Sequence, residues 1–465
     1  MTAIQPAIER AHSRSADLLP ARIFLLVAPL IFAAYALLTP PFQTFDENQH
    51  LYRAWQIASL QLTAERRGAE SGGSLPPGLE NATLQEIGSV VPQGERKAMV
   101  RPLSAMFSLN TSVGAGRPPI FYNFFGAAVY SPVGYVPQVI AVDIGRSTGL
   151  SVEWIVRLGR LLNSALCILL IWWALVQLPF GRWAMAIVAL LPPTAAGAAS
   201  FGQDGLVIGA AFLLTALGLR TAVEHHWTPR RVLISAIAAI AVTLSKFVYL
   251  PLVAVPLLPK PRAIPSWRWA WPPLLIGSLA ALLAVAWMRI NAHSIVSFLP
   301  SLQSPSEHVF WIVQHPLGYA ALVARTYAAM LPVLWAGFYR FGDSTVPIDV
   351  SAAVAGTAAL LLILIHGDDH ATGLTRARRA WMLSIAAIVA VLIASAIFVS
   401  FTRLGAAYIP SIQARYFVPI LPLTLVALMR KGEKPSLPVL PSALALTVVA
   451  QLLALGTIVR TFYTF

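Results

Sequence analysis

Charge is what this sequence has least of. Only 11% of its 465 residues are charged and 57% are apolar, whereas roughly a quarter of the residues in a soluble globular protein are charged. The mean hydropathy is +0.70. This balance excludes a disordered chain, a nucleic-acid-binding domain and an ordinary cytosolic enzyme. It indicates a polytopic membrane protein, in which lipid faces most of the side chains.

Cysteine is almost absent, and acidic residues are scarcer than basic ones. Cys167 is the one cysteine and lies in an apolar run, which excludes a disulfide framework and a cysteine-based metal site. The chain has 33 Lys and Arg against 19 Asp and Glu, a net charge of +14. In a membrane protein this excess indicates basic cytoplasmic loops that follow the positive-inside rule, so we expect no nucleic-acid partner. Walker, Rossmann and zincin motifs are also missing.

Long uncharged runs, by contrast, are abundant. A membrane-spanning helix needs about 20 predominantly apolar residues, and eleven runs are candidates. They are Ile23–Phe45, Leu161–Gly181, Trp183–Gln203, Gly205–Leu219, Val232–Ser245, Phe247–Pro259, Trp269–Met288, Val350–Ile365, Ala380–Thr402, Tyr416–Met429 and Pro435–Val459. The sequence therefore predicts an all-α, polytopic transmembrane bundle of about eleven spans, within a range of ten to thirteen, as a single integral membrane domain over residues 1–465.

The first run has two interpretations. Ala34-Tyr35-Ala36 has the small-x-small pattern of a signal-peptide cleavage site. However, this pattern lies inside the apolar run, and the basic segment before it is long. We therefore expect an uncleaved first span.

Basic connections give the orientation. They lie at Arg10 to Arg22, at Arg182, at Arg220 to Arg231, at Lys260 to Arg268, at Arg376 to Arg379 and at Arg430 to Lys434. Eleven spans place all of these connections in the cytoplasm, with the N-terminus inside and the C-terminus outside. The count of eleven spans requires the segment from Val232 to Leu258 to cross the membrane twice, as two short spans with Lys246 at the outer turn.

Two long extracytoplasmic segments remain, residues 40–153 and 291–349. Their apolar stretches Ile120–Val142 and Leu317–Phe338 are expected to be helices in the membrane interface or packed against the spans. The alternative is an extra pair of crossings in either segment. Ser71–Pro77, with its Gly and Pro pairs, is expected to be a flexible loop.

Ionisable residues beside the spans are candidates for function, because their desolvation costs several kcal/mol. Asp46 and Glu47 follow the first span, Asp204 and Lys246 occupy the next two outer turns, and Arg415 opens the tenth span. All of them face one side of the membrane, which indicates a site. Each also has a structural interpretation: the acid pair as a membrane boundary, Asp204 as a helix N-cap, and the two cations as interface-seeking side chains.

The densest group of polar residues follows the first span. If the segment is helical, Asp46, His50 and Arg53 share one face, and a carboxylate beside an imidazole suits general-base chemistry on a hydroxyl. His50 could instead have a structural hydrogen-bonding role. Asp46 and His50 are too few ligands to argue a divalent cation.

The same residues resemble the opening motif of an uncharacterised bacterial membrane-protein family, domain of unknown function 2142. The resemblance begins with Pro40-Pro41, Asp46-Glu47, His50 and Tyr52 to Ala58, and continues through Pro118-Pro119, Tyr130-Ser131-Pro132, Tyr135 to Gln138, Arg157 to Asn163, Pro192-Pro193, Ser200, Asp204, Ser245-Lys246, Tyr249, Pro251 and Gln413 to Pro419. It covers nearly the whole chain, but the family has no assigned function.

The layout of this family is similar to that of glycosyltransferases of the GT-C fold, which take sugars from polyprenyl-phosphate donors. By this resemblance Asp46 would be the catalytic base and Glu47 its partner, and these two would be the ligands of a divalent cation if one is used. The substrate-binding residues would be His50, Arg53, Asp204, Lys246, Arg415, Tyr416, Arg157 and Arg160. The long soluble outer domain of many such enzymes is missing, which leaves the acceptor open.

The resulting hypothesis is a glycosyltransferase of the bacterial inner membrane. It would move a sugar from a polyprenyl-phosphate carrier to a glycan, lipid or protein acceptor on the periplasmic or extracellular face. A transporter or flippase of lipid-linked sugars is the main alternative, although such proteins place polar groups near the bilayer midplane in repeated halves, and no repeat is evident in this sequence. A non-catalytic partner in polysaccharide assembly is the third hypothesis. Such a protein would tolerate replacement of Asp46 and Glu47.

Overall fold

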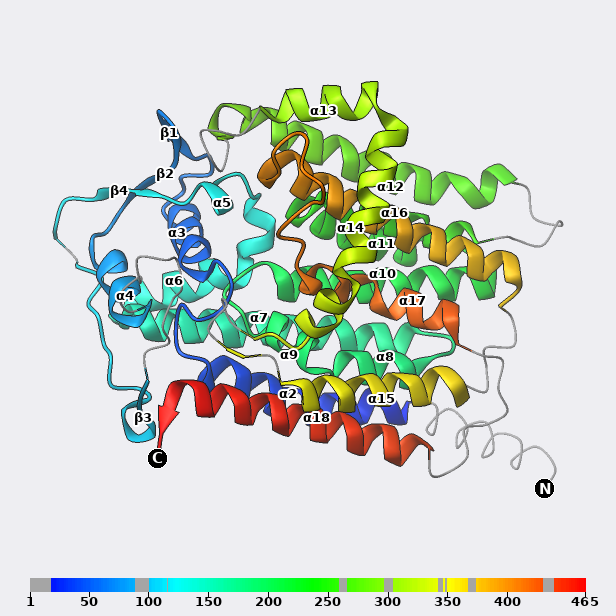
Figure 1. Cartoon of the computed structure of the whole chain (residues 1–465), viewed down its shortest axis with the longest axis horizontal. Coiled ribbons are helices and arrows are strands. Elements are labelled where there is room, and N and C mark those ends of the chain that lie inside the picture. The colour runs from blue at the N-terminus through cyan, green and yellow to red at the C-terminus, as the bar shows by residue number, and fades with distance from the viewer. Residues whose placement is uncertain are drawn as a thin grey trace.

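The computed structural model describes residues 18–87, 100–114, 116–258, 266–296, 304–341, 346–347, 349–366, 374–429 and 439–465. Long helices lie side by side in these parts of the chain, and short strands gather at one end of the bundle (Figure 1). The expected all-α fold of a polytopic membrane protein is confirmed.

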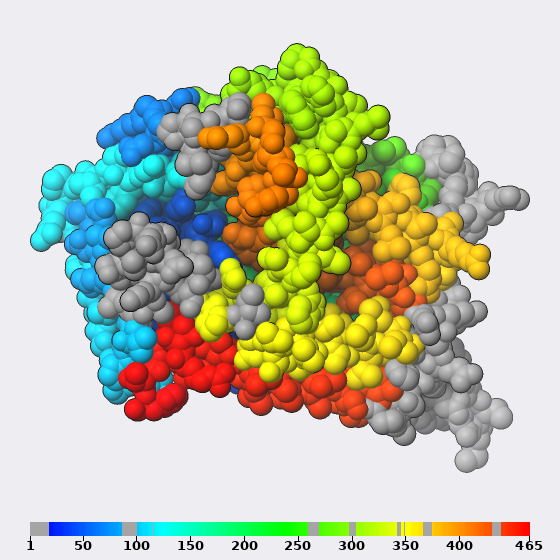
Figure 2. Space-filling view, viewed as in Figure 1, coloured from blue at the N-terminus to red at the C-terminus, as the bar shows by residue number. Residues whose placement is uncertain are grey.

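Seven helices of the described chain are long and apolar enough to cross a membrane. They are α2 (Leu19–Leu38), α7 (Val152–Gln177), α10 (Asp204–Glu224), α12 (Ser266–Ile290), α14 (Pro316–Gly337), α16 (Arg376–Phe401) and α18 (Val439–Phe462). Six of them match expected spans. The exception is α14, which falls where an interfacial helix was expected, and Figures 1 and 2 show it running across the other long helices on the face toward the viewer.

Shorter helices account for most of the remaining expected spans. They are α11 (Pro229–Ser245), the 3-10 helix η3 (Phe247–Leu257), α15 (Val350–His366), the 3-10 helix η6 (Ala414–Ile420) and α17 (Leu421–Leu428). The chain breaks between α11 and η3 at Lys246, as the positive-inside count requires.

The expected span Trp183–Gln203 is not one helix but two, α8 (Arg182–Ala189) and α9 (Pro192–Ala198). A proline disfavours helical backbone in the residue before it, and Leu191 is accordingly extended, with φ −71° and ψ 150°. The break shortens both pieces and leaves room for a loop, residues 199–203, before α10 begins.

The first long segment folds into a small layer at one end of the bundle. Its helices are α3 (Glu47–Ala58), α4 (Gly78–Ile87), η1 (Leu103–Ala105), α5 (Phe125–Ala128), η2 (Pro132–Tyr135) and α6 (Val136–Thr148). Three antiparallel strands, β1 (Glu65–Arg67), β2 (Glu70–Leu75) and β4 (Ile120–Asn123), pair in the order β1-β2-β4.

The expectation of a flexible loop at Ser71–Pro77 is wrong, because most of this stretch is the central strand β2. Its glycines serve close packing rather than flexibility. A Cβ added to Gly72 would lie 1.7 Å from the carbonyl oxygen of Tyr122, and one added to Gly73 would lie 2.8 Å from Nε2 of Gln56. Glycine in a strand often marks such a close approach.

The other long segment contains η4 (Ala292–Ser294) and α13 (Pro305–Gln314) before α14. A further strand pair closes the layer: β3 (Arg101–Pro102) is parallel to β5 (Tyr463–Thr464), which follows α18. The layer packs on the bundle through α6, which lies against α7, and through the pairing of β3 with β5.

Candidate functional site

Four of the charges beside the spans form one continuous ion-pair network. Nζ of Lys246 binds Oδ1 of Asp204, whose Oδ2 lies 3.4 Å from Nη1 of Arg415. The second guanidinium nitrogen of Arg415 lies 3.2 Å from Oδ2 of Asp46. Each residue stands at an end of a helix: Asp46 before α3, Asp204 at the start of α10, Lys246 after α11 and Arg415 in η6.

The structural interpretations, in which Asp204 is a helix N-cap and Lys246 is an interface-seeking side chain, do not match this geometry. Asp204 is the first residue of α10, and neither it nor Gln203 caps the helix with its side chain. Lys246 is paired, and its side chain is only 16% exposed. Both therefore serve the network.

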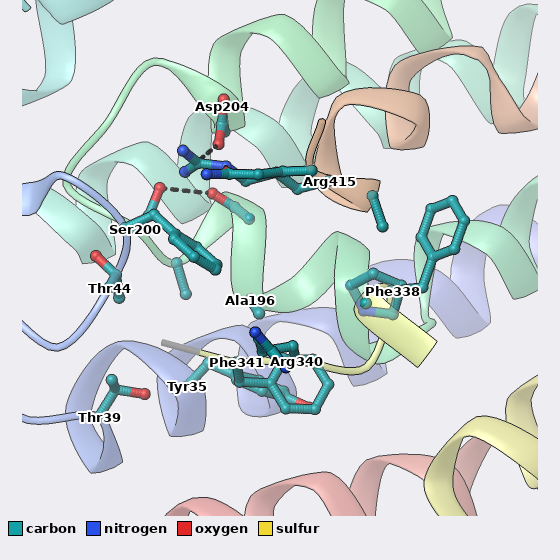
Figure 3. Close-up of a pocket in the computed structure, with 17 residues that line it drawn as sticks. Tyr35, Thr39, Thr44, Ala196, Ser200, Asp204, Phe338, Arg340, Phe341 and Arg415 are labelled. Atoms are coloured by element: carbon teal, nitrogen blue, oxygen red, sulfur yellow. Dashed lines mark hydrogen bonds and ion pairs between the residues drawn. The ribbon is translucent and has the colours of Figure 1, made fainter. Parts of the chain in front are cut away.

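A pocket opens beside this network (Figure 3). Its cavity volume is about 60 Å³, room for several water-sized groups. It is lined by Tyr35, Thr39, Thr44, Phe45, Pro193, Ala196, Gly197, Ala199, Ser200, Asp204, Gly337, Phe338, Arg340, Phe341, Gln413, Ala414 and Arg415. The break between α8 and α9 matters for the pocket, because α9 and the loop after it form one wall.

Aromatic rings hold the cations of the network. The guanidinium of Arg415 lies 4.6 Å from the ring centroid of Phe45 and 5.4 Å from that of Tyr416, and Nζ of Lys246 lies 5.3 Å from the Tyr416 centroid. Cations at such distances are attracted by the ring face. The hydroxyl of Tyr249 donates to the carbonyl of Tyr416 at 2.7 Å and fixes this residue, so the structure brings Tyr416 into the site.

Asp46 has an unusual backbone. Its φ of 55° and ψ of 18° are left-handed, a conformation that Asp and Asn adopt more readily than most residues. Its side chain is 52% exposed, and its neighbours Thr44 and Phe45 line the pocket. The turn thus presents a partly solvated carboxylate beside Arg415, where it can accept a proton from a bound hydroxyl.

Glu47 points elsewhere, into a buried ion pair. Oε2 lies 2.5 Å from Nη2 of Arg160, and both side chains are fully buried. Glu47 also accepts hydrogen bonds from the backbone N–H of Phe42 and of Phe201. Burial by itself raises the pKa of the Glu47 carboxyl, but the attraction of Arg160 outweighs it and the pKa is lowered.

Arg160 also donates to main-chain carbonyls of the last turn of α2 and of the residues that follow it. It donates to Ala36 at 3.1 Å and to Pro40 at 2.9 Å, and also to Thr39. Glu47 and Arg160 are fully buried and do not line the pocket, whereas Asp46, which does not line it either, is half exposed and paired with the lining residue Arg415. The geometry gives this pair an anchoring role and no support to the hypotheses of a catalytic Glu47 and a phosphate-binding Arg160.

The arginines Arg53 and Arg157 are also buried away from the pocket. Arg53 donates to the carbonyls of Leu62 at 2.7 Å and Tyr130 at 2.8 Å. Arg157 donates to the carbonyl of Met106 at 3.0 Å. Both arginines connect helices to the chain of the first long segment, and the structure does not place them within reach of a ligand in this pocket.

His50 lies one turn into α3, behind the network. Its Nδ1 is 2.7 Å from the hydroxyl oxygen of Tyr135. Burial lowers the pKa of His50 to about 4, although the carboxylates of Asp46 and Asp204 act to raise it. The imidazole is therefore neutral at neutral pH and provides a hydrogen bond rather than a charge.

This environment predicts a pH dependence of stability. Since the pKa of His50 is about 4 in the folded protein and 6.5 ordinarily, the unfolded chain binds more protons between these values, and stability decreases as the pH falls through this window. We expect His50→Gln to lessen the decrease in Tm between pH 7 and pH 4.5, measured by tryptophan fluorescence, and His226→Gln, at an exposed site, to leave it unchanged. Parallel curves of Tm against pH for the wild type and His50→Gln would contradict the assignment of this pH dependence to His50.

The donor set does not fit a protein-bound metal ion. In the part of the chain that the structure describes, no three His, Cys, Asp or Glu side chains gather as metal ligands do. Glu47 is occupied by Arg160, and the Asp46 carboxylate is paired with Arg415. We therefore assign no step to a divalent cation.

Arg340 is a site residue that the sequence did not point to. It follows α14, is exposed, and lines the pocket with Phe338 and Phe341. Leu317–Phe338 was expected to be an apolar interfacial helix, so charges at its end were not among those beside the expected spans. The one available signal was the arginine directly after this apolar run.

Comparison with known proteins identifies a family but no individual protein that the chain resembles. The family model described as "Predicted membrane protein (DUF2142)" matches residues 29–424. No curated protein and no solved structure matches the chain.

Proposed function

The chain belongs to the DUF2142 family of predicted membrane proteins, whose description names no reaction, and we propose its function from the pocket. The proposal is a glycosyltransferase that moves a sugar from a polyprenyl-phosphate donor to a cell-envelope acceptor. The observation that supports it most is the network of Asp46, Arg415, Asp204 and Lys246 beside the pocket. It places a partly exposed carboxylate next to fixed cations.

The reaction needs these two kinds of group. A hydroxyl oxygen of the acceptor attacks the anomeric carbon of the donor sugar, while Asp46 removes the hydroxyl proton. The bond from that carbon to the phosphate oxygen breaks, and its electron pair leaves with the polyprenyl phosphate. This leaving group departs ionised, so it requires cations where charge develops rather than a general acid.

The remaining residues would hold this arrangement. Asp204 bonds both Lys246 and Arg415 and so fixes their positions. The Glu47–Arg160 pair binds the turn after α2 to α7 and thereby positions Asp46, the residue before Glu47. In this proposal Glu47 is a positioning residue and Asp46 is the catalytic one.

The proposal also includes the setting. The protein would lie in a bacterial inner membrane with its N-terminus in the cytoplasm and its pocket on the periplasmic or extracellular face. The positive-inside rule supports this orientation. The acceptor class, whether glycan, lipid or protein, is left open, because the described chain has no separate soluble domain that would select it.

The test is reconstitution. The purified protein in liposomes receives polyprenyl-phosphate sugars and an acceptor extract, and the release of free polyprenyl phosphate is measured. We expect release that depends on the protein and on the acceptor. Transbilayer movement of intact donor without release would instead support a flippase, and neither result would support a non-catalytic partner.

Replacement of Arg415 should affect the donor more than the proton transfer. Because Arg415 is held between Asp46, Asp204 and two aromatic rings, we expect Arg415→Ala to raise the KM for the donor by at least about tenfold, the loss expected for one charge-assisted contact. The smaller effect should be on kcat. Donor titrations at saturating acceptor separate the two parameters. An unchanged KM with a reduced kcat would reassign Arg415 to orienting Asp46.

A further inference from the structure

The cations of the network are already neutralised. Asp46 and Asp204 contribute two negative charges, and Lys246 and Arg415 contribute two positive charges, within one chain of contacts. A phosphate that approached Arg415 would compete with carboxylates already bound to it. The network alone therefore offers an anion little net attraction.

Arg340 changes this balance. It lines the same pocket and is exposed, and it takes part in none of the ion pairs among the described residues. Figure 3 shows it at the opposite end of the pocket from Arg415 and Asp204, beside Phe341 and Tyr35. With Arg340 included, the charged groups that the structure describes around the pocket carry one net positive charge.

The surroundings of Arg340 suit an amphiphilic anion. Phe338, Phe341 and Tyr35 give this end of the pocket apolar walls beside the exposed Arg340. A guanidinium can bind two phosphate oxygens at once through its planar fork of N–H donors. A lipid phosphate presents oxygens to the guanidinium and an apolar chain to the aromatic walls.

We propose that Arg340 binds the phosphate group of a lipid phosphate in this pocket. The inference rests on the proposed function, since it names the residue that holds the donor. It also adds a cation that the sequence analysis did not assign: Arg340 binds the phosphate at one end of the pocket, and Arg415, which is paired with Asp46, contacts the donor at the other end.

Binding of farnesyl phosphate tests the inference without any reaction. We expect Arg340→Gln to weaken the binding to the purified full-length protein by roughly 10- to 100-fold, the loss of one hydrogen-bonded charge. Arg340→Lys should lose less, because it keeps the charge but not the fork. Arg325→Gln, which removes an exposed arginine of α14 outside the pocket lining, is the matched control and should bind as wild type does.

Two competitors identify the ligand. Farnesol, which has the chain without the phosphate, should compete weakly and equally in wild type and Arg340→Gln. Inorganic phosphate should compete only at much higher concentration than farnesyl phosphate. Equal competition by inorganic phosphate would show that the pocket selects free phosphate and would overturn the lipid assignment.

Failure of this inference and failure of the proposed reaction look different. Unchanged farnesyl phosphate binding in Arg340→Gln, or an equal loss in Arg325→Gln, would overturn the role of Arg340 even where sugar transfer is observed. Binding that depends on Arg340 in a protein that releases no polyprenyl phosphate would uphold the role of Arg340 and refute the transferase.

Discussion

Glu47→Gln should strongly destabilise the folded protein. The substitution leaves the fully buried Arg160 without its counter-charge, and loss of one partner of a buried ion pair costs about 3–5 kcal/mol. The amide also cannot accept as well from Arg160 and from the N–H groups of Phe42 and Phe201. We expect a marked fall in Tm and in the yield of folded protein.

The single cysteine makes this effect measurable. Cys167 is fully buried in α7, so a thiol-reactive fluorophore labels it only when the bundle opens. The control is Glu65→Gln, which removes a carboxylate that is 52% exposed from its pair with the half-exposed Arg67. Exposed pairs contribute about 0–1 kcal/mol, so its Tm should remain near wild type. Equal Tm values for the two variants would refute the anchoring role of Glu47.

Asp46→Asn should have the largest effect on activity. An amide cannot remove the acceptor proton, and loss of a general base lowers rates by about 10²- to 10⁴-fold. Asn tolerates the left-handed backbone of Asp46, so the fold and the Tm should be preserved. The measurement is kcat for polyprenyl phosphate release at equal amounts of folded protein.

Two further variants make this result specific. Asp143→Asn changes an exposed carboxylate of α6 outside the pocket lining and should retain wild-type kcat. Asp46→Ala should lose activity and also stability, because alanine is strained in the left-handed conformation. A kcat reduced as much by Asp143→Asn as by Asp46→Asn would indicate a general effect of charge.

Much of the site could be predicted because charges are rare in this chain. A charge beside an apolar span needs a partner or water, so Asp204, Lys246 and Arg415 are conspicuous in the sequence, and in the structure they bind one another. The break at Lys246 was also predictable, since only two crossings keep both basic flanks on one side of the membrane.

Other features could not be read from residue type or spacing. Asp46 and Glu47 are neighbours with similar side chains, yet one is half exposed and the other is fully buried. The difference arises from the left-handed backbone at Asp46, which depends on how the whole turn packs. Gly72 and Gly73 suggested a loop, because the sequence does not show Tyr122 and Gln56 against them. Arg340 could not be selected because only tertiary structure brings the end of α14 to the pocket.

One measurement tests the central claim most directly: release of polyprenyl phosphate by wild type and Asp46→Asn, compared in proteoliposomes of the same lipid, donor and acceptor content. Our proposal predicts protein-dependent release by wild type and almost none by Asp46→Asn, with both proteins equally folded by the Cys167 labelling assay. Equal release by the two proteins would contradict the assignment of Asp46 as the catalytic base.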